Sequence, residues 1–313
     1  MATYLVTGGA GFIGCNITRA LLAQGETVRV LDNFSTGRRE NLEGIGDQIT
    51  LCEADICDLE GIRPCFEGVD YVLHQGALPS VPRSVKDPVA TTDANVSGTL
   101  NVLLACRDAG VKRFVMASSS SIYGANTELP KHEGMRPLPI SPYAASKLSN
   151  EAYAAAAYHV YGLETVCLRY FNVFGPRQDP KSQYAAVIPI FVTALLKGER
   201  PTVFGDGEQS RDFTYVENVI QANIRAATSE GGAGGAFNIA CGARISLNEL
   251  LAYLNEIIGC DIEPIYADDR AGDVKHSLAD ISAAREAFGY DPQVTTREGL
   301  EKVVAWYRDE VGG

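Results

Sequence analysis

The sequence lacks the features of a membrane or secreted protein. No apolar stretch reaches the roughly 18 consecutive residues that a membrane-spanning helix needs, and no basic segment precedes an apolar one at the N-terminus. The chain has eight cysteines, but none forms a Cys-x-x-Cys pair or another spacing typical of a metal site. We therefore expect a cytoplasmic protein with reduced, mostly buried cysteines and no metal ion.

Basic residues are also scarce. Lysines and arginines number 27 against 39 aspartates and glutamates, which gives a net charge of −12. A surface that binds nucleic acid needs a basic patch, so this balance argues against a nucleic-acid partner. It does not argue against a small anionic ligand, because a few arginines in a pocket can hold one.

Short apolar runs alternate with helical stretches through the first half of the chain. The runs are 4–6, 28–31, 49–52, 71–74, 113–116 and 165–169, and the clearest helices run through 18–23, 95–109 and 142–161. This alternation predicts an α/β protein with a doubly wound parallel (Rossmann) sheet.

From about residue 175 the pattern loosens. Pro176, Pro180, Pro189 and Pro201 lie in loop-like segments with short helices between them, and one more strand is expected at 236–240. We expect a smaller mixed α/β substrate-binding domain at the carboxyl ends of the strands, where ligands of such sheets bind. The predicted division is residues 1–171 with about 214–240 for the sheet domain, and about 172–213 with 241–313 for the second domain.

Three glycines follow the first strand in the pattern Gly8-x-x-Gly11-x-x-Gly14. Gly8 permits a tight turn, Gly11 lets a pyrophosphate approach the backbone, and Gly14 lets the next helix pack closely on the sheet. A glycine turn alone occurs in many α/β proteins, but here the second strand also ends at a carboxylate, Asp32. That carboxylate suits the adenosine ribose hydroxyls of NAD and would repel the 2′-phosphate of NADP.

Two neighbouring features leave alternatives open. Arg38 and Arg39 follow Asp32, and arginine is the residue that an NADP site uses, which weakens the preference for NAD slightly. Asp55, after the third strand, could hold the adenine edge or could simply cap the N-terminus of a helix.

The helix 142–161 begins with residues that carry chemistry. Ser141 suits its N-cap and Pro142 its first position, so Tyr143 and Lys147 lie one turn apart on one face. A free tyrosine has a pKa of about 10, and a neighbouring ammonium together with a positive nicotinamide ring would lower it. The pair suits removing a proton from an alcohol while hydride leaves its carbon. Because Tyr-x-x-x-Lys is common by chance, it needs support from its surroundings.

Four serines, Ser118 to Ser121, end the strand before this helix. Hydroxyls at the carboxyl edge of a strand can hydrogen-bond a reacting alcohol and relay its proton, although four serines could also form a plain polar loop. Their place between a dinucleotide turn and Tyr-x-x-x-Lys favours the catalytic interpretation.

Together these motifs resemble the extended short-chain dehydrogenase/reductase family, nearly from end to end. The resemblance is carried by the glycine motif, Ser118-Ser119-Ser120, Tyr143-x-x-x-Lys147 and the segment 169–176, Arg-Tyr-Phe-Asn-Val-Phe-Gly-Pro. Within this family the chain resembles the UDP-N-acetylglucosamine/UDP-glucose 4-epimerase branch, and segments 80–84, 184–189 and 272–280 resemble its bacterial and archaeal members that act on UDP-N-acetylhexosamines.

The resemblance implies an isomerase that inverts the 4-hydroxyl of a UDP-hexose through a 4-keto intermediate. Tyr143 would take the hydroxyl proton with Ser119 bridging, tightly held NAD would accept and return the C4 hydride, and Lys147 would also bind the nicotinamide ribose. Implied NAD contacts are Gly8, Gly11, Phe12, Ile13, Gly14, Asp32, Asn33, Ser35, Gly37, Asp55, Ile56, Gln75, Ala77, Ser118, Tyr143, Lys147 and Tyr170.

The implied contacts with the UDP-sugar are spread along the chain. They are Ser80, Ser119, Ser120, Ser121, Tyr143, Asn172, Ala186, Val187, Thr202, Val203, Phe204, Arg211, Arg270, Asp273 and Ser277. Arg211 and Arg270 would pair with the diphosphate, with surface salt bridges as the alternative.

Two carboxylates of related enzymes are missing here. Family members that dehydrate sugars carry an Asp-Glu pair at the positions of Ser120 and Ser121, and nucleotide-sugar decarboxylases usually carry glutamate at the latter. Simple epimerisation needs neither.

Ser277 aligns with the position that walls the sugar 2-substituent, and a small residue there implies room for an N-acetyl group. We therefore expect turnover of UDP-GlcNAc/UDP-GalNAc and also of UDP-Glc/UDP-Gal.

Two other functions stay open. A UDP-glucuronate 4-epimerase would need a polar or basic contact to the C6 carboxylate, which the sequence does not assign. A non-catalytic NAD-binding sensor or scaffold belongs to a different class, and such proteins commonly lose the tyrosine or the lysine that this chain has.

Two structural expectations complete the sequence analysis. Helices 95–109 and 142–161 are apolar on every side and therefore need a second surface to pack against. The family resemblance implies that this surface is a second copy of the chain, in a homodimer with a four-helix interface. Burial of both helices within one subunit is the alternative. His74, at the end of the fourth run, is expected to be a core histidine with satisfied hydrogen bonds.

Overall fold

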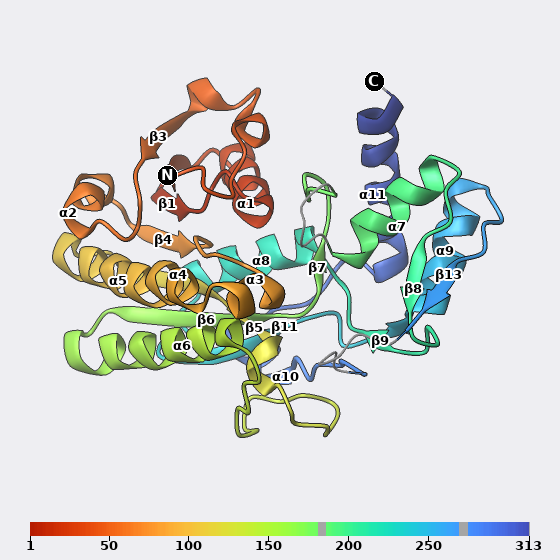
Figure 1. Cartoon of the computed structure of the whole chain (residues 1–313). Helices are drawn as coiled ribbons and strands as arrows, with labels where there is room; N and C mark the ends of the chain where they lie inside the picture. The colour runs from red at the N-terminus through yellow and green to blue at the C-terminus, as the bar shows by residue number, and fades with distance from the viewer. Residues whose placement is uncertain (181–185, 269–274, 313) are drawn as a thin grey trace.

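The computed structural model describes residues 1–180, 186–268 and 275–312. A seven-stranded sheet lies at its centre. Its strands all run parallel in the order β11-β6-β5-β4-β1-β2-β3 (Figure 1). The chain first adds strands on one side of β1 and then on the other, so the predicted doubly wound sheet is confirmed. These strands are β1 (Thr3–Thr7), β2 (Thr27–Asp32), β3 (Ile49–Glu53), β4 (Tyr71–His74), β5 (Arg113–Ser119), β6 (Glu164–Tyr170) and β11 (Ala236–Ile239).

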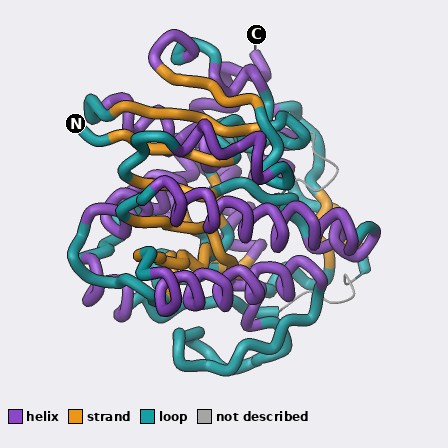
Figure 2. Tube along the Cα trace, turned by 90° about the vertical axis from the view of Figure 1, so that its left-hand side faces the viewer, coloured by secondary structure: helices purple, strands orange, loops and turns teal. Residues whose placement is uncertain are grey.

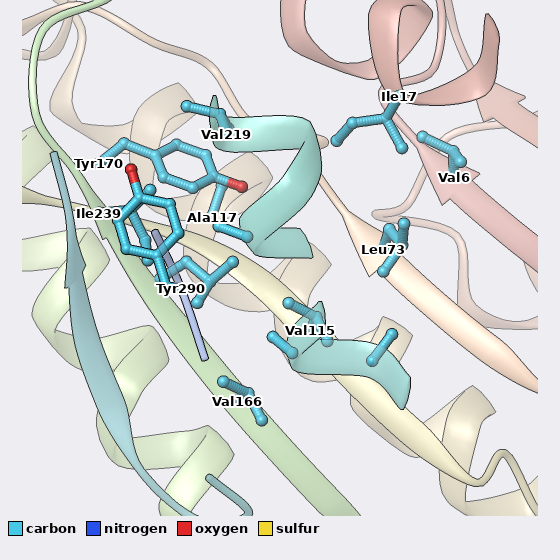
Figure 3. Packing of buried hydrophobic residues seen from close by; sticks show 14 of the residues in the cluster. Val6, Ile17, Leu73, Val115, Ala117, Val166, Tyr170, Val219, Ile239 and Tyr290 are labelled. Carbon is cyan, nitrogen blue, oxygen red and sulfur yellow. The ribbon is translucent and has the colours of Figure 1, made fainter. Parts of the chain in front are cut away.

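Helices cover both faces of this sheet (Figure 2). Successive side chains of a strand point to opposite faces, and the buried residues divide accordingly: Tyr4 and Val6 join one apolar cluster, and Leu5 joins the other. Figure 3 shows the first cluster, in which Ile17 and Val219 come from two helices. Its covering helices are α1 (Phe12–Ala23) and α8 (Val216–Thr228), and the second cluster includes residues of α2 (Leu59–Ile62), α5 (Gly98–Ala109) and α6 (Pro142–Tyr161).

The predicted start of the helix at residue 95 is wrong. The helical path begins earlier with α3 (Val81–Lys86) and α4 (Pro88–Thr92), and then passes through a π-helical turn, Asp93–Ser97, into α5. The missed start has a clear local cause, since the Asp87 carboxylate accepts a hydrogen bond from the Ala90 amide at 3.0 Å and Pro88 occupies the first helical position.

The second region has its own apolar core. Its buried residues come largely from α7 (Val187–Leu196), α9 (Leu247–Ile258) and α11 (Thr296–Gly312). Three two-stranded sheets complete it: β7 (Val173–Phe174) with β10 (Thr214–Tyr215), β8 (Thr202–Phe204) with β13 (Ile265–Ala267), and β9 (Ser210–Arg211) with β12 (Ile245–Ser246).

One helix of the predicted second domain packs elsewhere. Ala284 and Phe288 of α10 (Ser282–Phe288) belong to the first cluster of the large sheet, together with Tyr290. We therefore propose to assign residues 279–290 to the sheet domain and otherwise to keep the predicted division.

Three further observations concern membrane spans, metal-binding side chains and cysteines. None of the helices in the described ranges is both long and apolar enough to cross a membrane. Within the same ranges, no group of three or more metal-binding side chains gathers. All eight cysteines are free thiols.

Candidate active site

A cleft of about 1010 Å³ lies at the carboxyl ends of the sheet strands. Every residue predicted to contact NAD lines this cleft. Of the residues predicted to contact substrate, five also line it: Ser80, Ser119, Tyr143, Asn172 and Ala186. The structure therefore brings the predicted dinucleotide residues and the predicted reactive residues into one cavity.

The glycine turn has the shape that a pyrophosphate needs. Gly8 has a positive φ of 64°, and a Cβ at Gly14 would lie only 2.2 Å from the Gly8 carbonyl oxygen. Gly11 is the N-cap of α1, where no side chain makes a capping bond and no acidic residue lies in the first turn. The positive end of this helix can therefore face an anionic diphosphate, and the turn fits the group that the sequence predicts.

Asp32, the last residue of β2, lines the cleft and is held in place. Its carboxylate accepts hydrogen bonds from the amides of Ala10 at 2.9 Å and Phe34 at 2.8 Å. Burial raises the pKa of Asp32, and these two bonds oppose that rise. Gly37 faces the carboxylate so closely that a Cβ there would lie 2.7 Å from Oδ1. The loop after β2 therefore fixes this carboxylate at the cleft wall.

The two arginines that follow Asp32 contact carboxylates in this structure. Arg39 donates to both oxygens of Glu53 at 2.7 Å, and its guanidinium lies 4.0 Å from the centre of the Phe34 ring. Arg38 is 3.5 Å from Glu40 and 3.8 Å from Asp179. Arg39 is therefore held by Glu53 and is not among the residues that line the cleft, whereas Arg38 lines the cleft between Glu40 and Asp179.

The alternative interpretation of Asp55 as a helix cap is wrong. The N-cap of α2 is Asp58, which accepts a hydrogen bond from the Gly61 amide at 3.1 Å. Asp55 instead accepts from the Cys57 amide at 2.8 Å and from the Asn33 side chain at 2.9 Å, and it lines the cleft.

Tyr143 and Lys147 project from the first turns of α6. Ser141 caps this helix as predicted, accepting from the Ala144 amide at 3.1 Å. Lys147 is buried, its Nζ donates to the Ala117 carbonyl at 2.8 Å, and it lies 6.0 Å from the centre of the Tyr143 ring. The amino group therefore ties the helix to the end of β5, next to the serine run.

The pKa values of this pair are governed first by burial. Burial raises the pKa of Tyr143, and a hydrogen bond with the Ser119 side chain opposes the rise. Burial lowers the pKa of Lys147 to about 8, against the opposing influence of Cys167 and Glu151. The protein alone thus does not lower the pKa of the phenol, and the lowering that we expect depends on the charge of the nicotinamide ring.

The four serines do not share one environment. Ser118 and Ser119 line the cleft, whereas the chain turns at Ser120 into a short 3-10 helix, Ser120–Tyr123. The Ser119 hydroxyl accepts from the Ser121 amide at 3.2 Å and so caps this turn. Ser120 and Ser121 are not among the residues that line the cleft, unlike our expectation for substrate contacts.

Other predicted substrate residues lie in the second region and do not line the cleft. Val203 is fully buried in the apolar core of that region, on β8 with Thr202 and Phe204. Arg211 donates to the Lys275 carbonyl at 3.1 Å, and the Ser277 amide donates to the Ser210 carbonyl at 3.0 Å. Val187 begins α7, next to the lining residue Ala186, and the predicted contacts Arg270 and Asp273 lie outside the described residues.

His74 is a buried histidine with a partner at each ring nitrogen. Nδ1 lies 2.6 Å from the Thr7 hydroxyl, and Nε2 lies 2.9 Å from the Thr99 hydroxyl. Thr99 gives its proton to the Asn95 carbonyl at 2.5 Å, so it accepts from Nε2, and Nδ1 accepts from Thr7. This agrees with the expected core histidine, and burial lowers its pKa to about 3.

Several lining residues were not found from the sequence. Arg177, Gln178 and Asp179 line the cleft. Asp179 contacts Arg38 of another loop, and Arg177 has a positive φ of 67°. Asp93 lines it through the π-helical turn. No local motif marks these residues, because their place depends on chain segments that are far apart in the sequence.

Comparison with known proteins shows the family of the chain. A model of the NAD dependent epimerase/dehydratase family matches residues 4–240. The chain belongs to this family. It is 40% identical over 311 residues to the UDP-glucose 4-epimerase of Mycolicibacterium smegmatis, covering 98% of each protein.

Solved structures agree as well. The UDP-N-acetylglucosamine 4-epimerase from Methanobrevibacter ruminantium, in complex with UDP-N-acetylmuramic acid, has 41% identity and a TM-score of 0.94, with 99% of each chain covered. The UDP-glucose 4-epimerase from Thermotoga maritima with UDP-glucose has 40% identity, a TM-score of 0.94 and the same coverage. The predictions of the extended family, of NAD as cofactor and of an isomerase are confirmed.

Proposed function

We propose that this family member is a UDP-hexose 4-epimerase that interconverts UDP-GlcNAc and UDP-GalNAc, and also UDP-Glc and UDP-Gal. The observation that carries the proposal is that Ser119, Tyr143 and Lys147 line the same cleft as the glycine turn and Asp32. Relatives that are 4-epimerases for each of these two kinds of sugar nucleotide support it.

Each reactive residue has a role that its surroundings allow. NAD, when bound, supplies the acceptor and donor of the sugar hydride. Tyr143 removes the proton of the sugar 4-hydroxyl and returns it to the same oxygen. Ser119, which is hydrogen-bonded to Tyr143, orients that oxygen. The buried Lys147 ammonium lies 6.0 Å from the centre of the phenol ring, and together with the positive nicotinamide ring of bound NAD it would stabilise the phenolate.

The substrate side of the proposal rests on two groups of residues. Ser80, Asn172 and Ala186 line the cleft and would contact the sugar nucleotide there. Arg211 and Ser277 lie on neighbouring segments of the second region, since Ser277 bonds to Ser210 beside Arg211. Arg211 would hold the diphosphate, and the small side chain of Ser277 would leave room for a 2-acetamido group.

A direct assay tests this proposal against its alternatives. Purified protein is incubated separately with UDP-GlcNAc, UDP-Glc and UDP-glucuronate, and the products are resolved by anion-exchange chromatography. We expect the 4-epimers of the first two. Turnover of UDP-glucuronate alone would replace the substrate assignment. Heat-released NAD without turnover of any sugar nucleotide would favour a sensor or scaffold.

We further propose a cytoplasmic homodimer in which α5 and α6 pair with their copies in a four-helix interface. Val160 and Tyr161 near the end of α6 are 71% and 51% exposed, and Tyr153 on the same helix is 42% exposed. Light scattering on the purified protein should give twice the mass of the chain. The variant Tyr153→Lys should shift it towards the monomer, and a monomeric wild type would contradict the proposal.

A further inference from the structure

A buried ion pair lies behind the serine run and is not part of the predicted site. Glu151 of α6 and Arg169 of β6 are both buried, and the two side chains make a two-pronged contact at 3.0 Å and 2.8 Å. Bidentate pairs of this kind fix the orientation of both side chains. The pair is therefore a rigid connection between helix α6 and the sheet.

This pair contacts the end of β5 directly. Ser118 and Arg169 are register partners on neighbouring strands, and the Ser118 hydroxyl donates to the same carboxylate oxygen of Glu151 that accepts from Arg169 Nε. Arg169 also donates to the Tyr123 hydroxyl at 3.0 Å, which itself donates to the Asn238 side chain at 2.7 Å. These hydrogen bonds connect the pair to β5 and β11, and they leave little freedom to the strand end that carries Ser119.

Glu151 also lies on the reactive face of α6. Tyr143, Lys147 and Glu151 follow at intervals of four residues, so they form one row along the helix. Lys147 holds the Ala117 carbonyl and Glu151 holds the Ser118 hydroxyl, so two consecutive residues of β5 are tied to two consecutive turns of α6. This double attachment sets the position of Tyr143 relative to Ser119.

The charges of the pair act on the same row. The groups that influence the ionisation of Lys147 from its surroundings are Cys167 of β6 and Glu151 of its own helix, and Lys147 in turn acts on His74 of β4. Arg83 and Asp93 also line the cleft. Among these groups, Glu151 is the one whose charge Arg169 balances. Removing Glu151 would make the local potential more positive, and removing Arg169 would make it more negative.

We propose that Glu151 and Arg169 are positioning residues of the active site: their buried ion pair fixes α6 against the end of β5, and its balanced charge sets the pH range in which Tyr143 and Lys147 work. This inference rests on the proposed function for its kinetic test. Its spectroscopic test is independent of turnover.

The test uses opposite charge changes in the holoenzyme. In Glu151→Gln the uncompensated Arg169 cation favours loss of protons from Tyr143 and Lys147, so both limbs of the pH–kcat profile should move to lower pH by about one unit. In Arg169→Met the uncompensated carboxylate should move both limbs to higher pH by a similar amount. The double variant should return close to the wild-type profile.

A neutral control separates charge from packing. Tyr123→Phe removes a hydrogen bond of Arg169 without changing any charge, so its profile should keep the wild-type pH limbs even if kcat falls. Breaking a buried ion pair is destabilising, so one of the two single variants could fail to fold. The test then compares the other single variant with the double variant. If neither single variant folds, a displaced profile in the double variant contradicts the proposal.

A second readout does not need turnover. The tyrosinate absorbance near 295 nm is titrated in each variant, and the same titration of its Tyr143→Phe counterpart is subtracted, which isolates the ionisation of Tyr143. The midpoints should move in the same opposite directions as the kinetic limbs. Unmoved or same-sign midpoints overturn the proposal. If the midpoints move but the protein epimerises no sugar nucleotide, the role of the ion pair stands and the proposed function is wrong.

Discussion

Protonation of His74 should destabilise the folded protein. Burial lowers its pKa from an ordinary value of 6.5 to about 3, so the folded protein requires the neutral ring. The folded pKa lies below the unfolded one, so the stabilisation is complete above about pH 6.5 and is lost as the pH falls towards 3. At about pH 5 the linkage relation gives a loss of about 2 kcal/mol from this residue.

The hydrogen bonds explain why the charged ring is excluded. A proton added at Nδ1 would leave the proton of the Thr7 hydroxyl without its acceptor. It would also point a second donor at the Thr7 oxygen, which already accepts from the Gly76 amide at 3.2 Å. His74→Gln removes the titrating ring. The substitution itself should cost about 1–3 kcal/mol through lost hydrogen bonds, and this cost should not depend strongly on pH.

The assay is urea unfolding of wild type and His74→Gln at about pH 7.5 and about pH 5, with excess NAD throughout. The free energy advantage of the wild type should shrink by about 2 kcal/mol between the two conditions. His159→Gln is the matched control, because His159 is an exposed histidine of α6. A wild-type advantage that is the same at both pH values would refute the reasoning.

Two further predictions concern the cofactor and the substrate. Gly14→Ala should lower the NAD content of the purified protein at least tenfold, because its Cβ would lie 2.2 Å from the Gly8 carbonyl oxygen, whereas Gly46→Ala adds a methyl group in open space and should retain NAD. Chromatography of heat-released nucleotide measures both, and equal NAD contents would contradict the steric account. Ser277→Tyr should abolish turnover of UDP-GlcNAc and spare UDP-Glc, and an equal loss of both in paired assays would remove the proposed role of this residue.

Features that depend on neighbouring residues were predictable from the sequence. The glycine turn and Asp32 follow directly from strand ends, and the row of Tyr143 and Lys147 follows from the helical repeat. The cap at Ser141 was found in the same way, because the capping side chain and its amide are three residues apart. Each of these residues is positioned by one element whose periodicity is visible in the chain.

Features that depend on distant contacts were not predictable. Glu151 could have been noticed one turn after Lys147, but its partner Arg169 lies on another element and nothing local links the two. The loop contact of Arg38 with Asp179 joins segments separated by most of the sheet domain. The burial of Val203, which removes it from the cleft, likewise depends on helices far along the chain.

The central claim is that the Tyr143 phenol exchanges the proton of the sugar 4-hydroxyl in the NAD-containing cleft. The most direct measurement compares epimerisation of UDP-GlcNAc and UDP-Glc by wild type and Tyr143→Phe, with NAD content determined in the same samples. We predict that the variant retains NAD and loses at least about 100-fold in kcat. A variant that retains NAD and epimerises at the wild-type rate would contradict the account.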